Sequence, residues 1–149
     1  MSAVPAQASG GNVELDKARE VCPTLTRRQA GEGALVVDVR ERDEIARVAF
    51  DLPDVVVMPM SELEHRHGGL PRDRDLIMVC AVGERSLKAT YFLMYHGHSR
   101  VANMEGGIAK WVRKGFPVRG DAAAAVEATP ARCCGSANPA ASAGSCCGA

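Results

Sequence analysis

The chain has 149 residues, with 18 basic and 18 acidic side chains, so its formal net charge is zero. This length suits one compact domain with tails, and the balanced charge excludes the basic footprint of a nucleic-acid-binding protein. No stretch approaches the roughly 20 apolar residues of a membrane-spanning helix, and the first residues lack the pattern of a secretory signal. We therefore expect a cytoplasmic protein with no nucleic acid and no membrane among its partners.

The middle of the chain alternates between apolar runs and amphipathic stretches. The near-continuous β-branched run over 34–39 predicts a strand buried on both faces, as in a parallel sheet covered by helices. Strands that alternate with helices at this spacing predict an α/β domain with a central, mostly parallel sheet. In chain order we expect a helix over 13–22 ended by Pro23, strands over 24–26 and 34–39, a helix over 41–48, a strand over 54–58, a short helix over 61–64, a strand over 75–80, a helix over 86–96, a strand over 100–104 and a helix over 106–114.

The two ends of the chain differ in composition from its middle. Residues 1–12 are small and polar, and we expect them to be disordered. After Val118 the chain is rich in Ala, Gly, Ser and Pro, with almost no large apolar side chains to offset the entropy of ordering. The expected organisation is a folded domain over 13–118 and a flexible tail over 119–149.

Cys80 follows the expected buried strand directly and precedes a turn that leads into a helix. Six cysteines in a chain without an export signal favour thiol chemistry or metal binding over a disulfide scaffold. The turn 81–85 is placed to direct its N–H groups around the sulfur, and Gly83 supplies the conformational freedom that this curl needs. The carboxyl edge of an α/β sheet is where ligands bind. Cys80 is therefore a candidate nucleophile, and the alternative is that it only fills space at a strand end.

Four motifs in register resemble the single-domain rhodaneses over residues 20–118. Cys-Ala-Val-Gly-Glu-Arg at 80–85 is similar to their six-residue active loop, and Asp-Val-Arg-Glu at 38–41 to a motif after their second strand. Met-Ser-Glu-Leu at 60–63 and Glu-Gly-Gly-x-x-x-Trp at 105–111 also match. The resemblance implies a rhodanese-like three-layer fold, with a mostly parallel five-stranded sheet flanked by helices.

The resemblance also implies a reaction and a set of site residues. Cys80 would be the nucleophile that carries sulfur as a persulfide, and Asp38 and Arg40 would be buried, hydrogen-bonded residues near the site. The donor would be thiosulfate, polysulfide or a protein persulfide, and the acceptor cyanide, a thiol or a protein cysteine, with no metal and no cofactor. The residues implied in substrate binding are Ala81, Val82, Gly83, Glu84, Arg85 and Ser86.

Several features leave alternatives open within this interpretation. Gly-His-Ile-Pro-Gly-Ala, usual in such families, is replaced by Ala-Phe-Asp-Leu-Pro-Asp at 49–54, which predicts a differently shaped loop. Arg85 either guides an anionic donor or pins the loop through an ion pair. Glu84 either repels thiosulfate, which would favour polysulfide or a protein persulfide, or is simply solvated. Phosphatase or arsenate reductase activity is disfavoured, because the relatives of this fold with these activities have five residues between Cys and Arg, whereas this chain has four.

The remaining candidate ligands are four histidines and the tail cysteines. His65, His67, His96 and His98 do not form a convincing metal site. The paired cysteines of the tail either relay sulfur from Cys80, bind a soft metal ion, or have no specific role. The rival hypothesis is a non-turnover carrier of sulfur or soft metal. The tail cysteines concerned are Cys133, Cys134, Cys146 and Cys147.

Overall fold

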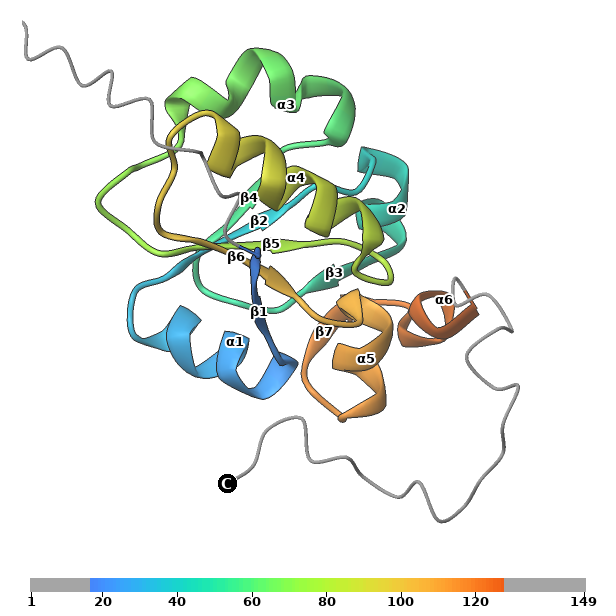
Figure 1. The fold of residues 1–149 in the computed structure, drawn as a ribbon. Helices are drawn as coiled ribbons and strands as arrows, with labels where there is room; N and C mark the ends of the chain where they lie inside the picture. Colours follow the sequence, from blue (N-terminus) through green and yellow to red (C-terminus); the bar gives the residue numbers. More distant parts are fainter. Residues whose placement is uncertain (1–16, 128–149) are drawn as a thin grey trace, which may run out of the picture.

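The computed structural model describes residues 17–127, which form an α/β domain in three layers. A central sheet of five parallel strands has the order β1-β6-β5-β2-β4. The predicted five-stranded, parallel architecture is therefore confirmed (Figure 1). The strands are β1 Arg19–Val21, β2 Leu35–Asp38, β3 Val48–Phe50, β4 Val55–Val57, β5 Leu76–Val79, β6 Val101–Met104 and β7 Val118–Gly120. The helices are α1 Pro23–Gly31, α2 Arg42–Arg47, α3 Met60–Arg66, the short 3₁₀ helix η1 His67–Gly69, α4 Glu84–Tyr95, α5 Gly107–Arg113 and α6 Ala122–Glu127.

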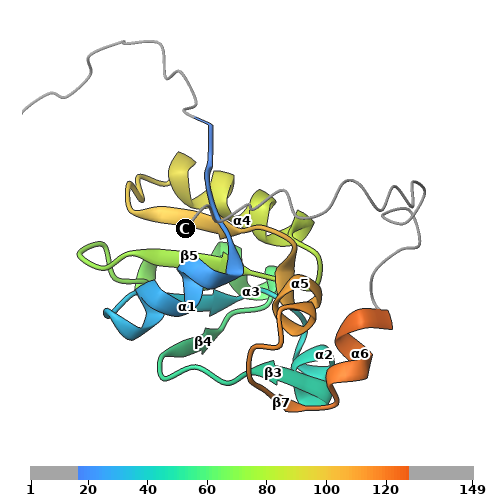
Figure 2. The same cartoon turned by 90° about the horizontal axis from the view of Figure 1, so that it is seen from below.

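The central strands bury both of their faces, which explains their continuous apolar sequence. Successive residues of β5 point to opposite sides: Ile77 joins one core cluster and Met78 the other. The first cluster includes Ile108 and Trp111 of α5, and the second includes Leu63 of α3 and Leu93 of α4. Accordingly, α1 and α5 lie on one face of the sheet, and α3 and α4 lie on the other (Figures 1 and 2).

The N-terminal elements differ from the expected ones. A strand, β1, lies at the end of the region expected to be helical, and a helix, α1, replaces the edge strand expected over 24–26. Pro23 begins α1 instead of ending a helix, because its missing N–H and fixed φ suit the first helical turn. The Cys22 sulfur accepts a hydrogen bond from the amide of Leu25 at 3.5 Å and caps the same helix. Pairing of β1 with β6 is a long-range contact that the local pattern does not reveal.

Regular structure also continues past Val118, where we expected the tail to begin. β7 pairs antiparallel with β3, so that Phe50 lies opposite Val118 and Val48 opposite Gly120. α6 then packs beside α5 and β3, and Ala125 is buried in the core that contains Trp111 (Figure 2). Backbone pairing and small buried side chains hold this segment, although its composition is poor in large apolar residues.

The described residues contain no helix that is long and apolar enough to cross a membrane. The residues expected to be disordered at the N-terminus, and most of the expected tail, lie outside the described part of the chain.

Candidate active site

Cys80 lies at the carboxyl end of β5, the central strand of the five. The residue has 0% relative exposure and belongs to the core cluster beneath α4. It is free, without a disulfide. A thiol at this place is next to the sheet edge where open α/β folds bind ligands, so burial alone does not make it inert core filling.

The residues after Cys80 form a tight loop around its sulfur. The amide of Gly83 donates a hydrogen bond to Cys80 Sγ over 3.0 Å. Gly83 adopts φ +99° and is the N-cap of α4, whose first residue, Glu84, comes two residues earlier than expected. Within residues 17–127, the amides of Val82, Glu84 and Arg85 have no hydrogen-bond acceptor. The loop therefore presents N–H donors that are available to a sulfur atom or an anion.

The N-terminal residues of α5 fix this loop through backbone hydrogen bonds. The amide of Ile108 donates to the Cys80 carbonyl at 2.9 Å, and that of Ala109 donates to the Ala81 carbonyl at 3.2 Å. Because these two carbonyls are occupied by α5, the peptide groups of the loop are fixed in orientation. A Cβ on Gly107 would lie 2.4 Å from the Ala81 carbonyl, so only glycine allows this approach. The Glu-Gly-Gly motif, noted in the sequence only as a family signature, thus shapes the loop.

Ser86 connects the sulfur to a buried polar side chain. Its hydroxyl lies 3.2 Å from Cys80 Sγ and 2.6 Å from Asn103 Oδ1. One hydroxyl proton serves one of these acceptors at a time. Asn103 in turn donates from Nδ2 to Glu20 at 3.4 Å. Asn103 was missed in the sequence, since nothing local to it signals a contact with Ser86.

Asp38 and Arg40 are buried and joined by a close ion pair, as expected from the resemblance. Arg40 Nη2 lies 2.7 Å from Asp38 Oδ2, and Arg40 Nε lies 3.0 Å from Asp38 Oδ1. Asp38 also accepts the Arg40 amide at 3.1 Å. The pair fixes the turn between β2 and α2, which brings α2 beside the loop.

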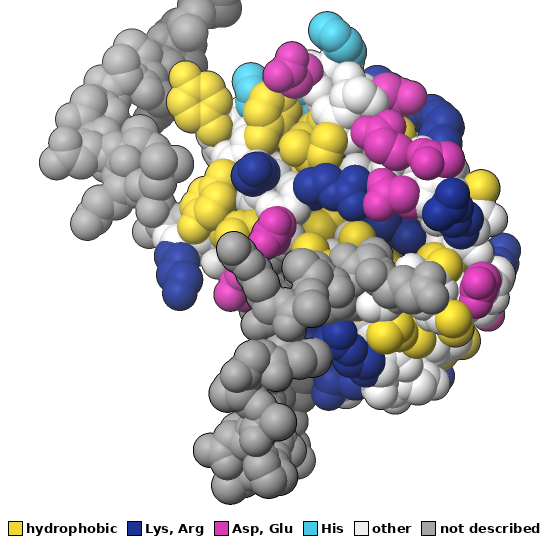
Figure 3. All heavy atoms as spheres, turned by 90° about the vertical axis from the view of Figure 1, so that its right-hand side faces the viewer, with side chains coloured by type: hydrophobic (Ala, Val, Ile, Leu, Met, Phe, Trp, Pro, Cys, Tyr) yellow, Lys and Arg dark blue, Asp and Glu magenta, His cyan; other side chains and the backbone are white. Residues whose placement is uncertain are grey.

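Arg85 forms the kind of ion pair that would pin the loop, and its role toward an anionic donor stays a prediction. Both of its terminal nitrogens donate to the Glu44 carboxylate, each over 2.7 Å. These hydrogen bonds lower the pKa of Glu44 and raise the pKa of Arg85. Glu84 is exposed and forms no ion pair within the described range. Basic and acidic side chains are mixed on the face of the molecule that carries α2 (Figure 3).

The other candidate ligands do not join this site. His67, His96 and His98 gather at the opposite end of α4, where the rings of His67 and His96 are 4.4 Å apart. No group of three or more His, Cys, Asp or Glu able to hold a metal ion occurs within residues 17–127. The tail cysteines Cys133, Cys134, Cys146 and Cys147 lie outside the described residues, so their sulfur-relay or soft-metal roles stay predictions.

Comparison with known proteins places this geometry in a family. Residues 23–114 match the family model of the rhodanese-like domain. A sulfurtransferase of Allochromatium vinosum is 40% identical over 96 residues, which cover 64% of this chain and 88% of that protein. Thiosulfate sulfurtransferase 18 of Arabidopsis thaliana is 32% identical over 66% of this chain and 80% of its own length. The crystal structure of a rhodanese-related protein from Thermoplasma volcanium aligns with a TM-score of 0.60 and 31% identity, covering 67% of this chain and 96% of that one.

Proposed function

The chain belongs to the rhodanese-like domain family, and from this premise we propose that it is a sulfurtransferase in which Cys80 carries the transferred sulfur as a persulfide. Similarity to sulfurtransferases supports sulfur transfer in general. The observation that carries the role of Cys80 is the 3.0 Å hydrogen bond from the Gly83 amide to its sulfur, in a loop whose other N–H groups lack acceptors in the described structure.

The loop is suited to a sulfur atom that bears negative charge. Backbone N–H groups in a ring stabilise an anion without any charged side chain. The outer sulfur of a persulfide on Cys80 would find these donors already oriented, because α5 and the Glu44–Arg85 pair hold the loop in place. Side chains contribute little inside the loop, since Ala81 and Val82 are apolar.

The reaction proceeds in two steps, with ping-pong kinetics. The Cys80 thiolate attacks the outer sulfur of a donor such as thiosulfate; the S–S bond of the donor breaks, and sulfite leaves with the bonding electrons. Cys80 then holds one additional sulfur. A nucleophilic acceptor, such as cyanide, a thiol or a protein cysteine, attacks that sulfur, and the Cys80 thiolate leaves. No oxidant or reductant is consumed.

Polysulfide or a protein persulfide competes with thiosulfate as the donor in this proposal. Glu84 lies at the rim of the loop and is exposed, so its charge disfavours a dianion only weakly through water. The relative from Arabidopsis is named for thiosulfate, which supports thiosulfate as the first donor to test.

Intact-mass measurement of the full chain after incubation with thiosulfate, and separately with polysulfide, tests the proposal. The wild type should gain the mass of one sulfur atom and lose it on addition of cyanide. Cys80→Ser, which cannot hold a persulfide, should gain none at the core site and should lose turnover by at least a thousandfold. Substantial turnover in this variant would place the chemistry elsewhere.

The same assay separates an enzyme from the rival sulfur carrier. An enzyme releases thiocyanate over many cycles, whereas a carrier loads once and stops. Peptide mapping of the loaded chain then shows whether Cys133, Cys134, Cys146 or Cys147 also acquires sulfur, as the relay hypothesis predicts.

A further inference from the structure

Cys22, directly after β1, is the second cysteine of the described domain. In the structure it is disulfide-bonded, whereas Cys80 is free, so its partner is not among residues 17–127. The four other cysteines of the chain all lie beyond residue 127. We propose that Cys22 is a redox site that forms a reversible disulfide with the C-terminal pair Cys146-Cys147, and that this bond fastens the end of the chain beside the Cys80 loop. The inference goes beyond the proposed function, because the bond can form whether or not Cys80 carries sulfur.

Cys22 and Cys80 lie at the same edge of the sheet and at the same level along it. Glu20 of β1 and Met78 of β5 are both in register with Asn103 of β6, and the three strands are parallel. Each cysteine follows its registered residue by two positions. Because β6 separates β1 from β5, the two cysteines are about 10 Å apart across the sheet. A disulfide needs Cα atoms within about 7 Å of each other, so the partner of Cys22 must come from elsewhere.

The position of Cys22 suits thiol exchange. β1 is an edge strand of the described sheet, and its residues Arg19 and Glu20 are exposed. Cys22 Sγ is the N-cap acceptor of α1, bound by the Leu25 amide at 3.5 Å. The N–H groups and the positive dipole end of a helix N-terminus favour a thiolate, which is the form that exchanges disulfides. Cys22 therefore combines a reactive setting with a place at the margin of the sheet.

The length of chain beyond α6 selects the C-terminal pair as the partner. α6 packs against α5, and α5 also packs against α1 (Figure 2). Two interhelix spacings of this kind amount to about 20 Å between α6 and the start of α1. Cys133 is six residues beyond Glu127, and even a fully extended chain of that length reaches only about 21 Å. Cys146 is 19 residues beyond Glu127, and a coil of that length, as the composition predicts, spans about 25 Å.

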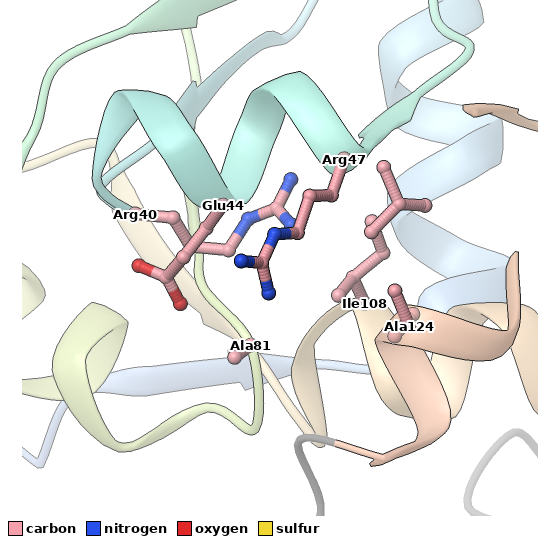
Figure 4. Close-up of a pocket in the computed structure, with 8 residues that line it drawn as sticks. Arg40, Glu44, Arg47, Ala81, Ile108 and Ala124 are labelled. Atoms are coloured by element: carbon pink, nitrogen blue, oxygen red, sulfur yellow. The ribbon is translucent and has the colours of Figure 1, made fainter. Parts of the chain in front are cut away.

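The helix from which the chain leaves the described domain also lies beside the active loop. Ala124 of α6 lines a cavity of about 300 Å³ together with Ala81, the residue after Cys80, and with Arg40, which follows β2 (Figure 4). β2 and β1 lie on opposite sides of β5 in the sheet. The chain therefore leaves the domain on one side of the Cys80 loop, and a bond to Cys22 returns its end to the other side.

Adjacent cysteines favour a distant partner over each other. Neighbouring Cα atoms are about 3.8 Å apart, whereas a disulfide joins Cα atoms about 4.4–6.8 Å apart, so a bond between Cys146 and Cys147 is strained. A tethered partner has an effective concentration in the millimolar range. Cys22 of the same chain therefore competes well against a thiol of a second copy.

Formation of the bond balances with a small disulfide as the oxidant. A thiolate of the Cys146-Cys147 pair attacks a disulfide such as oxidised glutathione, whose S–S bond breaks, and one glutathione thiolate leaves. The Cys22 thiolate then attacks the tail sulfur of this mixed disulfide, and the second glutathione leaves. Two protein thiols lose two electrons and two protons in total, and the oxidant becomes two thiols. Excess thiol reverses both steps.

Peptide mapping without reduction tests the bond in the full-length chain. The protein is equilibrated with reduced and oxidised glutathione, and free thiols are blocked with N-ethylmaleimide. Trypsin then releases Cys22 in residues 20–27 and the tail cysteines in residues 133–149. Monomeric wild type should give a cross-link between these two peptides that disappears on reduction. A Cys22 that stays a thiol, or that bonds only glutathione or a second copy, overturns the proposal.

Two double variants identify the partner. Cys146→Ser with Cys147→Ser should lower the yield of the cross-link about tenfold or more, because the tethered partner is lost. Cys133→Ser with Cys134→Ser is the matched control and should leave the yield unchanged. An equal loss in both variants, or a loss in the control alone, overturns the assignment to the C-terminal pair.

Thermal unfolding supplies a second measurement of the same bond. The disulfide closes a loop that contains nearly the whole chain, and long loops remove the most entropy from the unfolded state. Oxidised wild type should therefore melt about 5 °C or more above its reduced form. Cys22→Ser should abolish this difference and still fold, because serine also caps a helix such as α1. A difference that persists in Cys22→Ser overturns the proposal.

The variant Cys80→Ser separates this inference from the proposed function. It should form the same cross-link as wild type, because Cys80 is free in the structure. A cross-link in a chain that transfers no sulfur supports the redox site independently of the reaction. Sulfur transfer by wild type that never forms the cross-link overturns the redox site and leaves the proposed function intact.

Discussion

The two ends of α4 differ in whether their polar side chains have hydrogen-bond partners. At its N-terminal end, Ser86 contacts both Cys80 and Asn103, and Arg85 is bound to Glu44 by two hydrogen bonds. At its C-terminal end, His98 is 4% exposed, yet among the described residues its Nε2 has no hydrogen-bond partner, and Nδ1 of His67 also lacks one there. Tyr95 beside them is 80% exposed.

The difference lies in the hydrogen-bond partners that the fold supplies to polar groups at the two ends. Buried polar groups cost free energy unless a partner offsets the lost hydration. Near Cys80 that cost is offset by partners from α2, β6 and α5, which also orient the loop. Around His98, the charges of Arg72, His67 and His96 disfavour its protonated form, and within residues 17–127 no partner accepts or donates a hydrogen bond at its Nε2.

The largest expected effect comes from disrupting the contact between α5 and the Cys80 loop, at the N-terminal end of α4. In Gly107→Ala the new methyl group would meet backbone atoms of Ala81 and Cys80 within 2.4 to 2.5 Å. We expect a loss of about 3 kcal/mol or more in the free energy of unfolding, from a left-handed alanine together with a backbone clash. Urea titration measures the loss, and sulfur transfer should fall with it.

Gly115→Ala is the matched control for that change. Gly115 also has a positive φ, +76°, but a Cβ there would meet nothing within 4 Å. Only the conformational strain of about 1–2 kcal/mol applies to it. If the two variants lose the same stability, the close approach of Gly107 to the loop is unimportant.

Removal of the Ser86 hydroxyl would leave a buried polar group at the N-terminal end of α4 without its partner, as at the C-terminal end. Ser86→Ala leaves Asn103 Oδ1 buried without its 2.6 Å partner, which should cost about 1–3 kcal/mol of stability. It also removes a hydrogen bond from Cys80 Sγ, so we expect persulfide formation to slow about tenfold. Stopped-flow loading with polysulfide and urea unfolding measure the two effects. Exposed Ser61→Ala should change neither, and unchanged values in Ser86→Ala would remove Ser86 from the site.

The smallest expected effect is a pH dependence of stability that arises from His98, at the C-terminal end of α4. Burial, and after it the charges of Arg72, His67 and His96, lower the pKa of His98. The folded protein therefore binds fewer protons than the unfolded chain as the pH falls below about 6.5, and stability declines there.

Substitution of His98 by glutamine should flatten this decline by up to about 1 kcal/mol between pH 7 and 5. Urea midpoints measured across that range, with exposed His65→Gln as the control, give the comparison. A wild-type curve as flat as that of His98→Gln would mean that His98 does not contribute.

The sequence predicted the parts of this molecule that depend on local pattern. Local pattern predicted the strands β2, β4, β5 and β6, and the position of Cys80 between an apolar run and a helix predicted the loop. The errors lie where distant pairing decides: β1 forms because it meets β6, and β7 forms because it meets β3. The partners Asn103 and Glu44 are 17 and 41 residues from the side chains they bind, Ser86 and Arg85, so no local window contains both members.

The hydrogen bonds from α5 to the loop also determine when the loop becomes oriented during synthesis of the chain. A ribosome synthesises Cys80 well before residues 107–109, and until those residues are in place the carbonyls of Cys80 and Ala81 lack the donors that orient the loop. A nascent chain that ends between them carries an ordinary thiol without its N–H cradle. In the proposed mechanism, Cys80 therefore acquires its oriented N–H groups only when α5 folds onto the loop.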